Sequence, residues 1–170
     1  MSKRRAGAVC SLAAVIGLLL AHGHIRTNEE GLNLIGNAEG CRLDPYICPA
    51  GVPTDGVGNT HNVRAGKTLE QIADDWRGNI LDAEACVNRY GNGANIPDNA
   101  FSAAVSLTFR VGCGKVRNST LFTLLKEGPE ALPSACNQFL RWKYGGGKVL
   151  PGLVTRSLAE KNLCLKDVKK

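Results

Sequence analysis

The region from Arg42 to Asn62 cannot form a helix, and this restricts the chain to a mixed fold. Proline fixes φ and lacks a backbone N–H, and glycine favours turns, so a region that contains both at short intervals folds back on itself. Its prolines and glycines are Pro45, Pro49, Gly51, Pro53, Gly56 and Gly58. We expect a small β-hairpin there, in a chain whose other segments show helical patterns.

Those other segments carry helix start and stop signals. An apolar segment that includes Leu32 and Ile35 ends near Glu39. Thr68 and Gln71 have the spacing of a capping box, in which two side chains satisfy free N–H groups of a first turn. The helices expected after the hairpin are residues 68–91, 97–109, 120–127, 134–142 and 155–165. The sequence therefore predicts an α+β, mostly helical fold, in which residues 27–170 form one domain.

Residues 1–26 form a separate N-terminal segment. Lys3, Arg4 and Arg5 precede an apolar run from Ala6 to Ala21, a pattern typical of an export signal. A permanent membrane helix needs about 20 strongly apolar residues, so this shorter and weaker run is compatible with leaving the bilayer again. An ordinary signal peptide, cleaved after residues 21–23, is the alternative.

The chain contains seven cysteines, a number typical of proteins of oxidising compartments. Because the count is odd, one thiol is left over if the N-terminal segment, with Cys10, is retained. If that segment is removed, six cysteines remain and all can pair, which would also engage Cys48. The other cysteines are Cys41, Cys86, Cys113, Cys136 and Cys164.

The candidate catalytic residues are Glu39, Cys48 and Thr54. Eight residues separate the first two and five separate the last two, so an acid, a thiol and a hydroxyl follow one another from a helix end into the expected hairpin. Hydrolysis of a glycosidic bond requires a proton donor on the leaving oxygen and a second group that activates water or attacks carbon. Glu39 suits the first role, and Cys48 with Thr54 suits the second.

This spacing resembles the motif of the phage-type lysozymes, the family of the T-even phage enzyme, which is Glu-x8-Asp/Cys-x5-Thr. Neighbouring motif positions also match, namely Arg42, Leu43, Tyr46, Gly56 and Gly58. The resemblance implies a lysozyme-like fold, with a small β-hairpin lobe and a larger helical lobe around a cleft. It also implies hydrolysis of the β-1,4 bond between N-acetylmuramic acid and N-acetylglucosamine in peptidoglycan, with Glu39 as general acid and Thr54 helping to place a water.

Cys48 stands where most members of that family have aspartate. A thiolate can act as a base toward water or as a covalent nucleophile. The sequence therefore leaves both the role of Cys48 and the stereochemistry of hydrolysis open.

The cysteines Cys10, Cys41 and Cys48 resemble those of the disulfide-caged signal-anchor-release endolysins of enterobacterial phages. The resemblance implies export to the host periplasm and tethering to the inner membrane by the N-terminal segment until release. It also implies that Cys41 first cages Cys48, and that Cys10 takes Cys41 over by thiol–disulfide exchange. Four cysteines allow three connectivities, and a lysozyme-like helical lobe favours structural bonds between Cys86 and Cys113 and between Cys136 and Cys164.

Charge and the remaining motifs limit the partners. The formal net charge of +6 suits attraction to an anionic cell wall, and on charge alone it suits nucleic acid equally. The resemblance implies that the partner is peptidoglycan, and we expect a monomer. Zinc-finger and helix-turn-helix patterns do not accompany this charge, and nucleic acid is not expected. The chain has three histidines and no paired metal-ligand motif, so neither a metal nor another cofactor is expected. Arg141 and Trp142 are weaker candidates for substrate contact.

Two other functions remain open. One is a peptidoglycan peptidase, with Cys48 as nucleophile and His61 as base. The other is an exported, membrane-tethered protein that binds the cell wall without catalysis. Product analysis separates the three, because lysozyme action creates reducing sugar ends, peptidase action creates free amino groups, and binding alone creates neither.

Overall fold

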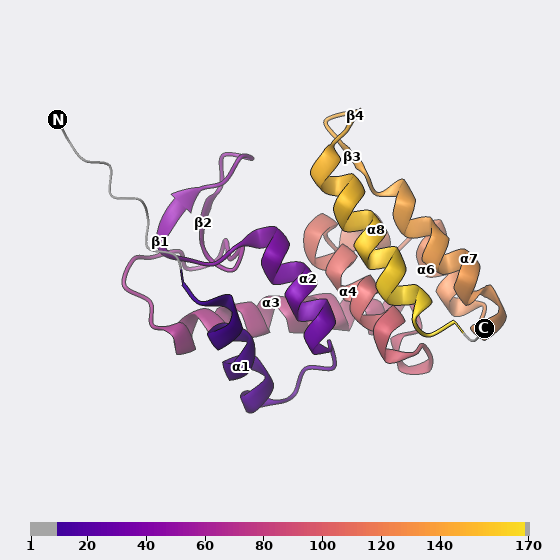
Figure 1. Cartoon of the computed structure of the whole chain (residues 1–170), viewed down its shortest axis with the longest axis horizontal. Coiled ribbons are helices and arrows are strands. Elements are labelled where there is room, and N and C mark those ends of the chain that lie inside the picture. Colours follow the sequence, from indigo (N-terminus) through magenta and orange to yellow (C-terminus); the bar gives the residue numbers. More distant parts are fainter. Residues whose placement is uncertain (1–9, 169–170) are drawn as a thin grey trace. The chain divides into compact units, whose positions relative to one another are not determined.

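The computed structural model describes residues 10–168 (Figure 1). The positive residues Lys3, Arg4 and Arg5 of the expected export signal lie outside this range. The chain divides into two compact units. The first unit consists of Met1–Gly23 and Gly36–Asn79, and the second unit consists of His24–Ile35 and Ile80–Lys170. The elements of the described residues are α1 (Leu12–His22), α2 (Glu29–Glu39), β1 (Arg42–Ile47), β2 (Pro53–Gly56), α3 (Leu69–Tyr90), α4 (Asp98–Val111), α5 (Cys113–Val116), α6 (Thr120–Lys126), α7 (Leu132–Asn137), β3 (Tyr144–Gly145), β4 (Lys148–Val149) and α8 (Pro151–Leu165).

In the first unit, helix α1 is formed by residues of the expected export signal. Its start is capped by Ser11, whose hydroxyl accepts the backbone N–H of Ala14 at 3.3 Å. A Cβ placed on Gly36 of α2 would lie 2.5 Å from a methyl carbon of Leu12, so α1 packs against α2 at a position where only glycine fits. The buried side chains of α1 are Val15, Ile16 and Leu19. None of the helices within residues 10–168 has the length and apolar character needed to cross a membrane.

The expected hairpin is confirmed in the first unit. Strands β1 and β2 pair antiparallel, with Tyr46 opposite Thr54 and Arg42 opposite Gly56. The register shifts between Arg42 and Tyr46, which is the signature of a bulge. Gly56 lies at a φ of +52°, and a Cβ there would lie 3.1 Å from Ile72 of α3, so the end of the hairpin packs directly on that helix.

The core of the second unit is built on α4. Every residue of α4 from Ala100 to Thr108 is buried, and α8 and α4 pack along each other. Glu160 of α8 is fully buried and accepts hydrogen bonds from Ser106 at 2.8 Å and from Arg110 at 3.0 Å. Since an unpaired buried carboxylate would be costly, these partners stabilise the contact between the two helices.

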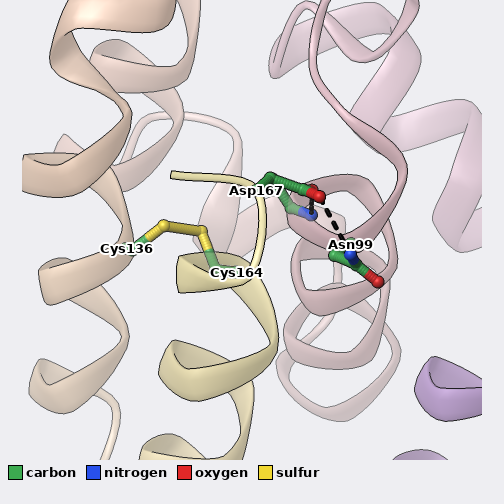
Figure 2. The surroundings of a disulfide bond; sticks show 5 residues. Asn99, Cys136, Cys164 and Asp167 are labelled. Atoms are coloured by element: carbon green, nitrogen blue, oxygen red, sulfur yellow. Dashed lines mark hydrogen bonds between the residues drawn. A yellow bond between two sulfur atoms is a disulfide. The ribbon is translucent and has the colours of Figure 1, made fainter. Parts of the chain in front are cut away.

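The end of α8 is held in two ways, both visible in Figure 2. A disulfide joins Cys164 of α8 to Cys136 of α7. Next to it, the Asp167 carboxylate accepts the side-chain amide of Asn99 and the backbone N–H of Ala100, both at 2.8 Å. The second contact satisfies a free N–H in the first turn of α4 and places a negative charge at the positive end of that helix.

Helix boundaries follow the sequence signals in some places and depart from them in others. The capping box is present, because Gln71 accepts the N–H of Thr68 at 3.0 Å and Thr68 accepts the N–H of Gln71 at 3.2 Å. Helix α8 begins at Pro151, earlier than the expected Thr155, since proline is well suited to a first helical position. Helix α7 ends at Asn137 and continues as a 3-10 helix from Gln138 to Arg141.

The β3–β4 hairpin was not predicted. Strand β3 pairs with β4 through a two-residue turn formed by Gly146 and Gly147, at φ values of +57° and +77°. A tight hairpin turn of this kind needs positive φ at both central residues, which glycine adopts without strain.

Candidate active site

The hairpin of the first unit gathers three polar side chains on one side. Side chains two residues apart in extended chain point the same way, so Cys48, the residue after β1, lies on the same side of the hairpin as Tyr46. Thr54 lies directly opposite Tyr46 on β2 and therefore belongs to the same face. A tight turn connects the strands, in which Gly51 donates to the carbonyl of Cys48 at 2.8 Å and Cys48 donates to the carbonyl of Val52 at 3.0 Å.

Cys48 is the one free cysteine within residues 10–168. The backbone N–H of Val52, as a hydrogen-bond donor to the sulfur, lowers the pKa of the thiol more than burial raises it. The N–H of Ala50 and the hydroxyl of Thr54 lower this pKa further. Hydrogen bonds to the charged form stabilise a thiolate, so the turn residues 50–52 favour the reactive form of Cys48.

Thr54 is buried, with 3% of its surface exposed. Its hydroxyl donates to the carbonyl of Val52 at 3.0 Å and also acts on the sulfur of Cys48. A hydroxyl carries one hydrogen and two acceptor lone pairs, so Thr54 can exchange this donor between the carbonyl and the thiolate and still accept a hydrogen bond from water.

Glu39 is the last residue of α2 and is half-buried. Gly40 follows at a φ of +74° and ends the helix. A Cβ on Gly58, which lies at a φ of +63°, would be 3.0 Å from Oε2 of Glu39 and 3.2 Å from its Cγ. The backbone of the segment after β2 therefore approaches the Glu39 side chain as closely as a glycine allows.

Tyr46 links the two candidate catalytic groups electrostatically. Burial raises the pKa of its phenol, and the negative charges of Glu39 and Cys48 raise it further. Arg42 acts in the opposite sense, with its guanidinium carbon 4.6 Å from the centre of the Tyr46 ring. Glu39 and Cys48 both lie close enough to act on this phenol, so the first unit brings the predicted acid and the predicted thiol together.

A buried ionic network holds the segment after β2. Asp55 is 1% exposed, and its carboxylate accepts Asn59 at 2.7 Å, the N–H of Arg64 at 2.9 Å and the Lys67 ammonium at 2.6 Å. Lys67 also contacts Asp75 of α3 at 2.8 Å. Burial acts to raise the pKa of Asp55, but hydrogen bonds from Lys67, Asn59 and Arg64 outweigh it and lower this pKa. The residue that follows Thr54 is therefore fixed to α3 through Lys67.

The cysteines of the expected switch lie in the first unit. Cys10 forms a disulfide with Cys41, and its backbone N–H donates to the Cys41 carbonyl at 3.3 Å. Both residues are buried. In the second unit the disulfides are Cys86 with Cys113 and Cys136 with Cys164, the two pairings favoured from the sequence.

Arg141 and Trp142 lie in the second unit, around a surface pocket of about 350 Å³. Arg141 is exposed, and its guanidinium lies 3.3 Å from the amide oxygen of Gln138. The carbonyl of Trp142 accepts hydrogen bonds from Arg110 at 2.9 Å and Ser157 at 3.1 Å. The other lining residues are Lys115, Asn118, Ser119, Thr120, Leu121 and Gln138.

His61 is exposed, and it is not among the groups that shift the pKa of Cys48. Its backbone carbonyl accepts the side-chain amide of Asn59 at 2.7 Å. Within residues 10–168, no group of three or more histidine, cysteine, aspartate or glutamate side chains has the arrangement of a metal site.

Sequence reasoning did not assign a role to Tyr46, Asp55 or Lys67. Asp55 had a detectable signal, because an acidic residue in the middle of a short, turn-rich strand is unusual unless it is paired. No sequence signal identified the partner of Asp55, because Lys67 and Asp75 follow too far along the sequence for a local pattern to relate them to the hairpin.

Comparison with known proteins identifies the family of this chain. The model of the Phage lysozyme family matches residues 36–160, which include Glu39, Cys48 and Thr54. The chain is 44% identical to the SAR-endolysin of Escherichia phage P1, over 94% of this chain and 92% of the relative. The crystal structure of the active form of the phage P1 endolysin matches with a TM-score of 0.88 at 43% identity, over 96% of this chain and 98% of that one.

The crystal structure of the secreted inactive form of the same phage P1 endolysin matches less well. Its TM-score is 0.60 at 42% identity, over 85% of this chain and 98% of that one. The family match covers well over half of the chain, and the curated relative is matched over nearly its whole length. The chain belongs to the phage lysozyme family and is a glycoside hydrolase of the muramidase class.

Proposed function

We propose that Glu39, Cys48 and Thr54 carry out the reaction of this phage lysozyme, the hydrolysis of the β-1,4 bond between N-acetylmuramic acid and N-acetylglucosamine in peptidoglycan. Glu39 donates its proton to the leaving glycosidic oxygen as the bond to carbon breaks. The contact of Gly58 with the Glu39 side chain supports this role, because it limits the positions that the carboxyl can take.

Cys48 supplies the second group, on the other side of the sugar. Its thiolate either removes a proton from the attacking water, with Thr54 helping to hold that water, or attacks the sugar carbon and is later displaced by water. The observation that carries this proposal is the lowered pKa of Cys48, caused by donors from Val52, Ala50 and Thr54. A lower pKa increases the thiolate fraction at any given pH, and the thiolate is the form that either route requires.

Replacement of Glu39 by glutamine tests the assignment. Glutamine keeps the shape but carries no transferable proton, so turnover of purified peptidoglycan should fall about 10²–10⁴-fold while circular dichroism stays unchanged. Wild-type digestion should release reducing sugar ends. Release of free amino groups, or near wild-type turnover by Glu39→Gln, would instead favour a Cys48/His61 peptidase, and release of neither product would favour a wall-binding protein.

We further propose that the enzyme is exported to the host periplasm, held at the inner membrane by residues 1–26, and then released as a monomer. The apolar run from Ala6 to Ala21 supports this. So does α1, in which part of that run forms a helix with Val15, Ile16 and Leu19 buried in the first unit. The SAR-endolysin of phage P1 is similar over 94% of this chain, including most of that segment.

Release is coupled to activity by a disulfide exchange. In the tethered form Cys41 is bonded to Cys48, and the thiol of Cys10 is unreacted. The Cys10 thiolate attacks the sulfur of Cys41, the new Cys10–Cys41 bond forms, the Cys41–Cys48 bond breaks, and Cys48 leaves as a thiolate with no net oxidation. The Cys10–Cys41 bond with free Cys48 supports this as the product state, as does the better match to the active form of the phage P1 endolysin.

The direction of this exchange follows from the surroundings of Cys48. A thiol with a lower pKa is the better leaving group. Donors from residues 50–54 lower the pKa of Cys48, so they favour the state in which Cys48 carries the negative charge and Cys10 is bonded. The same hydrogen bonds thus serve both the exchange and the hydrolytic reaction.

A further inference from the structure

The outer face of α8 in the second unit is apolar where a soluble helix is ordinarily charged. Leu150, the residue before α8, and Val154 and Leu158 within it follow one another at intervals of four residues and are 42%, 40% and 47% exposed. The inner face of the same helix carries the buried Arg156, Ser157 and Glu160, so the apolar residues do not serve the core of the second unit. Among the first ten residues of α8, none of the exposed side chains is charged.

The β3–β4 hairpin extends this face. Tyr144 and Val149 pair directly across the hairpin and are 59% and 49% exposed. Figure 1 shows the hairpin at the N-terminal end of α8, where Leu150 donates its N–H to the carbonyl of Lys143 at 3.0 Å. Of the nine exposed large apolar residues within residues 10–168, five are therefore collected in this short segment. We name the set Tyr144, Val149, Leu150, Val154 and Leu158 the α8 face.

Every charged side chain of the segment that carries the α8 face is basic, and the exposed Glu30 near Ala159 is paired with Lys166. Residues 131–159 contain no aspartate or glutamate. Lys143 lies next to the Tyr144 ring, with its ammonium 5.9 Å from the ring centre, and Lys148 is exposed in β4. An apolar centre with a basic border is the chemistry of a surface that binds at the boundary of an anionic bilayer, where the apolar side chains enter the acyl region and the lysines meet lipid phosphates.

We propose that the α8 face binds the surface of an anionic phospholipid bilayer, independently of the N-terminal segment. A glycan partner would need several hydrogen-bonding groups next to stacked aromatic rings, and Tyr144 is the one aromatic and hydroxyl-bearing side chain of the α8 face, whose other four members are aliphatic. A second copy of this chain would bring a second set of lysines against the first, which costs energy. Binding through this face would keep the released enzyme next to the membrane, in the layer where peptidoglycan is also found.

The test uses the full-length chain and vesicles of phosphatidylcholine, with and without phosphatidylglycerol. One variant combines Lys143→Glu with Lys148→Glu, and a second combines Val154→Ser with Leu158→Ser. The control combines Arg117→Glu with Lys126→Glu, which makes the same change in net charge at exposed positions elsewhere in the second unit. All three keep residues 1–26, so the contribution of the N-terminal segment is equal in each.

The lysine variant should lose at least about tenfold in co-sedimentation with vesicles that contain phosphatidylglycerol, and the control should lose much less. The apolar variant should bind both kinds of vesicle more weakly than wild type. Both should keep wild-type turnover of purified peptidoglycan, which also shows that they fold. Equal binding by the lysine variant and the control would overturn the proposal. Loss of turnover would assign the face to the substrate, and a dimer that dissociates in either variant would assign it to a second copy.

Discussion

In the phage-type lysozyme motif that this chain resembles, Cys48 stands where most members have aspartate, and hydrogen bonds from Val52, Ala50 and Thr54 lower the pKa of its thiol. The donors of residues 50–54 surround the sulfur, and the same donors would also stabilise a carboxylate. The Cys48→Asp variant should therefore keep activity and become insensitive to thiol-alkylating reagents, whereas Cys48→Ser should lose about 10²–10⁴-fold.

Turnover of purified peptidoglycan, before and after iodoacetamide treatment, measures both variants. Alkylation should abolish wild-type activity, because Cys48 is the one free thiol within residues 10–168. Equal loss in Cys48→Asp and Cys48→Ser would contradict a general-base role. It would leave the covalent route, in which sulfur itself bonds to the sugar.

Gly58 limits the position of Glu39 through a close approach of the backbone. In Gly58→Ala the new methyl group would meet Oε2 of Glu39 at 3.0 Å, and displacement of a catalytic group by about 1 Å can cost about 100-fold in rate. Gly66→Ala is the matched control, since Gly66 has a φ of +76° and nothing within 4 Å of its added Cβ. Both should lose about 1–2 kcal/mol of stability from the left-handed backbone, and only Gly58→Ala should lose at least about tenfold in kcat. Equal kcat in the two variants would contradict the positioning role.

The hairpin and the start of α3 act as one element because of the contact between Asp55, Lys67 and Asp75. The Lys67 side chain is 3% exposed, so removal of one partner leaves a poorly compensated buried charge. We expect Asp55→Asn to lower the free energy of unfolding by about 3 kcal/mol at neutral pH. Asp74→Asn, which affects an exposed ion pair with Arg77 at 3.6 Å, should change it by less than about 1 kcal/mol.

The pH dependence of this loss has a defined sign. The pKa of Asp55 is lowered in the folded protein, so its stabilising contribution is fully present above the unfolded pKa and is lost as the pH falls through the folded pKa. The difference between wild type and Asp55→Asn, measured by urea denaturation, should therefore shrink on acidification. A difference that stays constant down to the lowest accessible pH would show that Asp55 acts through packing and not through its charge.

The sequence predicted those elements whose signals are local. Three of these signals depend on residues within a few positions of one another. They are the capping box of Thr68 and Gln71, the turn-rich hairpin at residues 42–62, and the end of α2 at Gly40. Helix α8 begins before the expected Thr155, because Pro151 occupies the first helical position and Thr155 lies one turn further on. The Asp55–Lys67–Asp75 contact was not predictable, since it joins three segments that only the folded chain brings together.

The three disulfides within residues 10–168 are divided between the two units. The bonds Cys86–Cys113 and Cys136–Cys164 both lie within the second unit, and Cys10–Cys41 lies within the first, with the free Cys48. Loss of a native disulfide in a small domain typically costs about 2–5 kcal/mol. The variant Cys86→Ser with Cys113→Ser should therefore be less stable and yet respond to release as wild type does, which makes it a control for the exchange.

Cys10→Ser tests whether the chain as a whole is switched by this exchange. The variant should still be exported and anchored, because one hydroxyl adds little polarity to the apolar run, but no thiol remains to attack the bond between Cys41 and Cys48. The released protein should stay inactive until a reductant is added.

Adding Cys41→Ser removes the residue that cages Cys48, so the double variant should be active at once, without exchange or reductant. Turbidity loss of permeabilised cells, with disulfide mapping of each fraction by mass, measures both outcomes. Lysis by Cys10→Ser at the wild-type rate without reductant, or recovery of a released chain that lacks residues 1–26, would remove the switch and leave the role of Glu39 untouched.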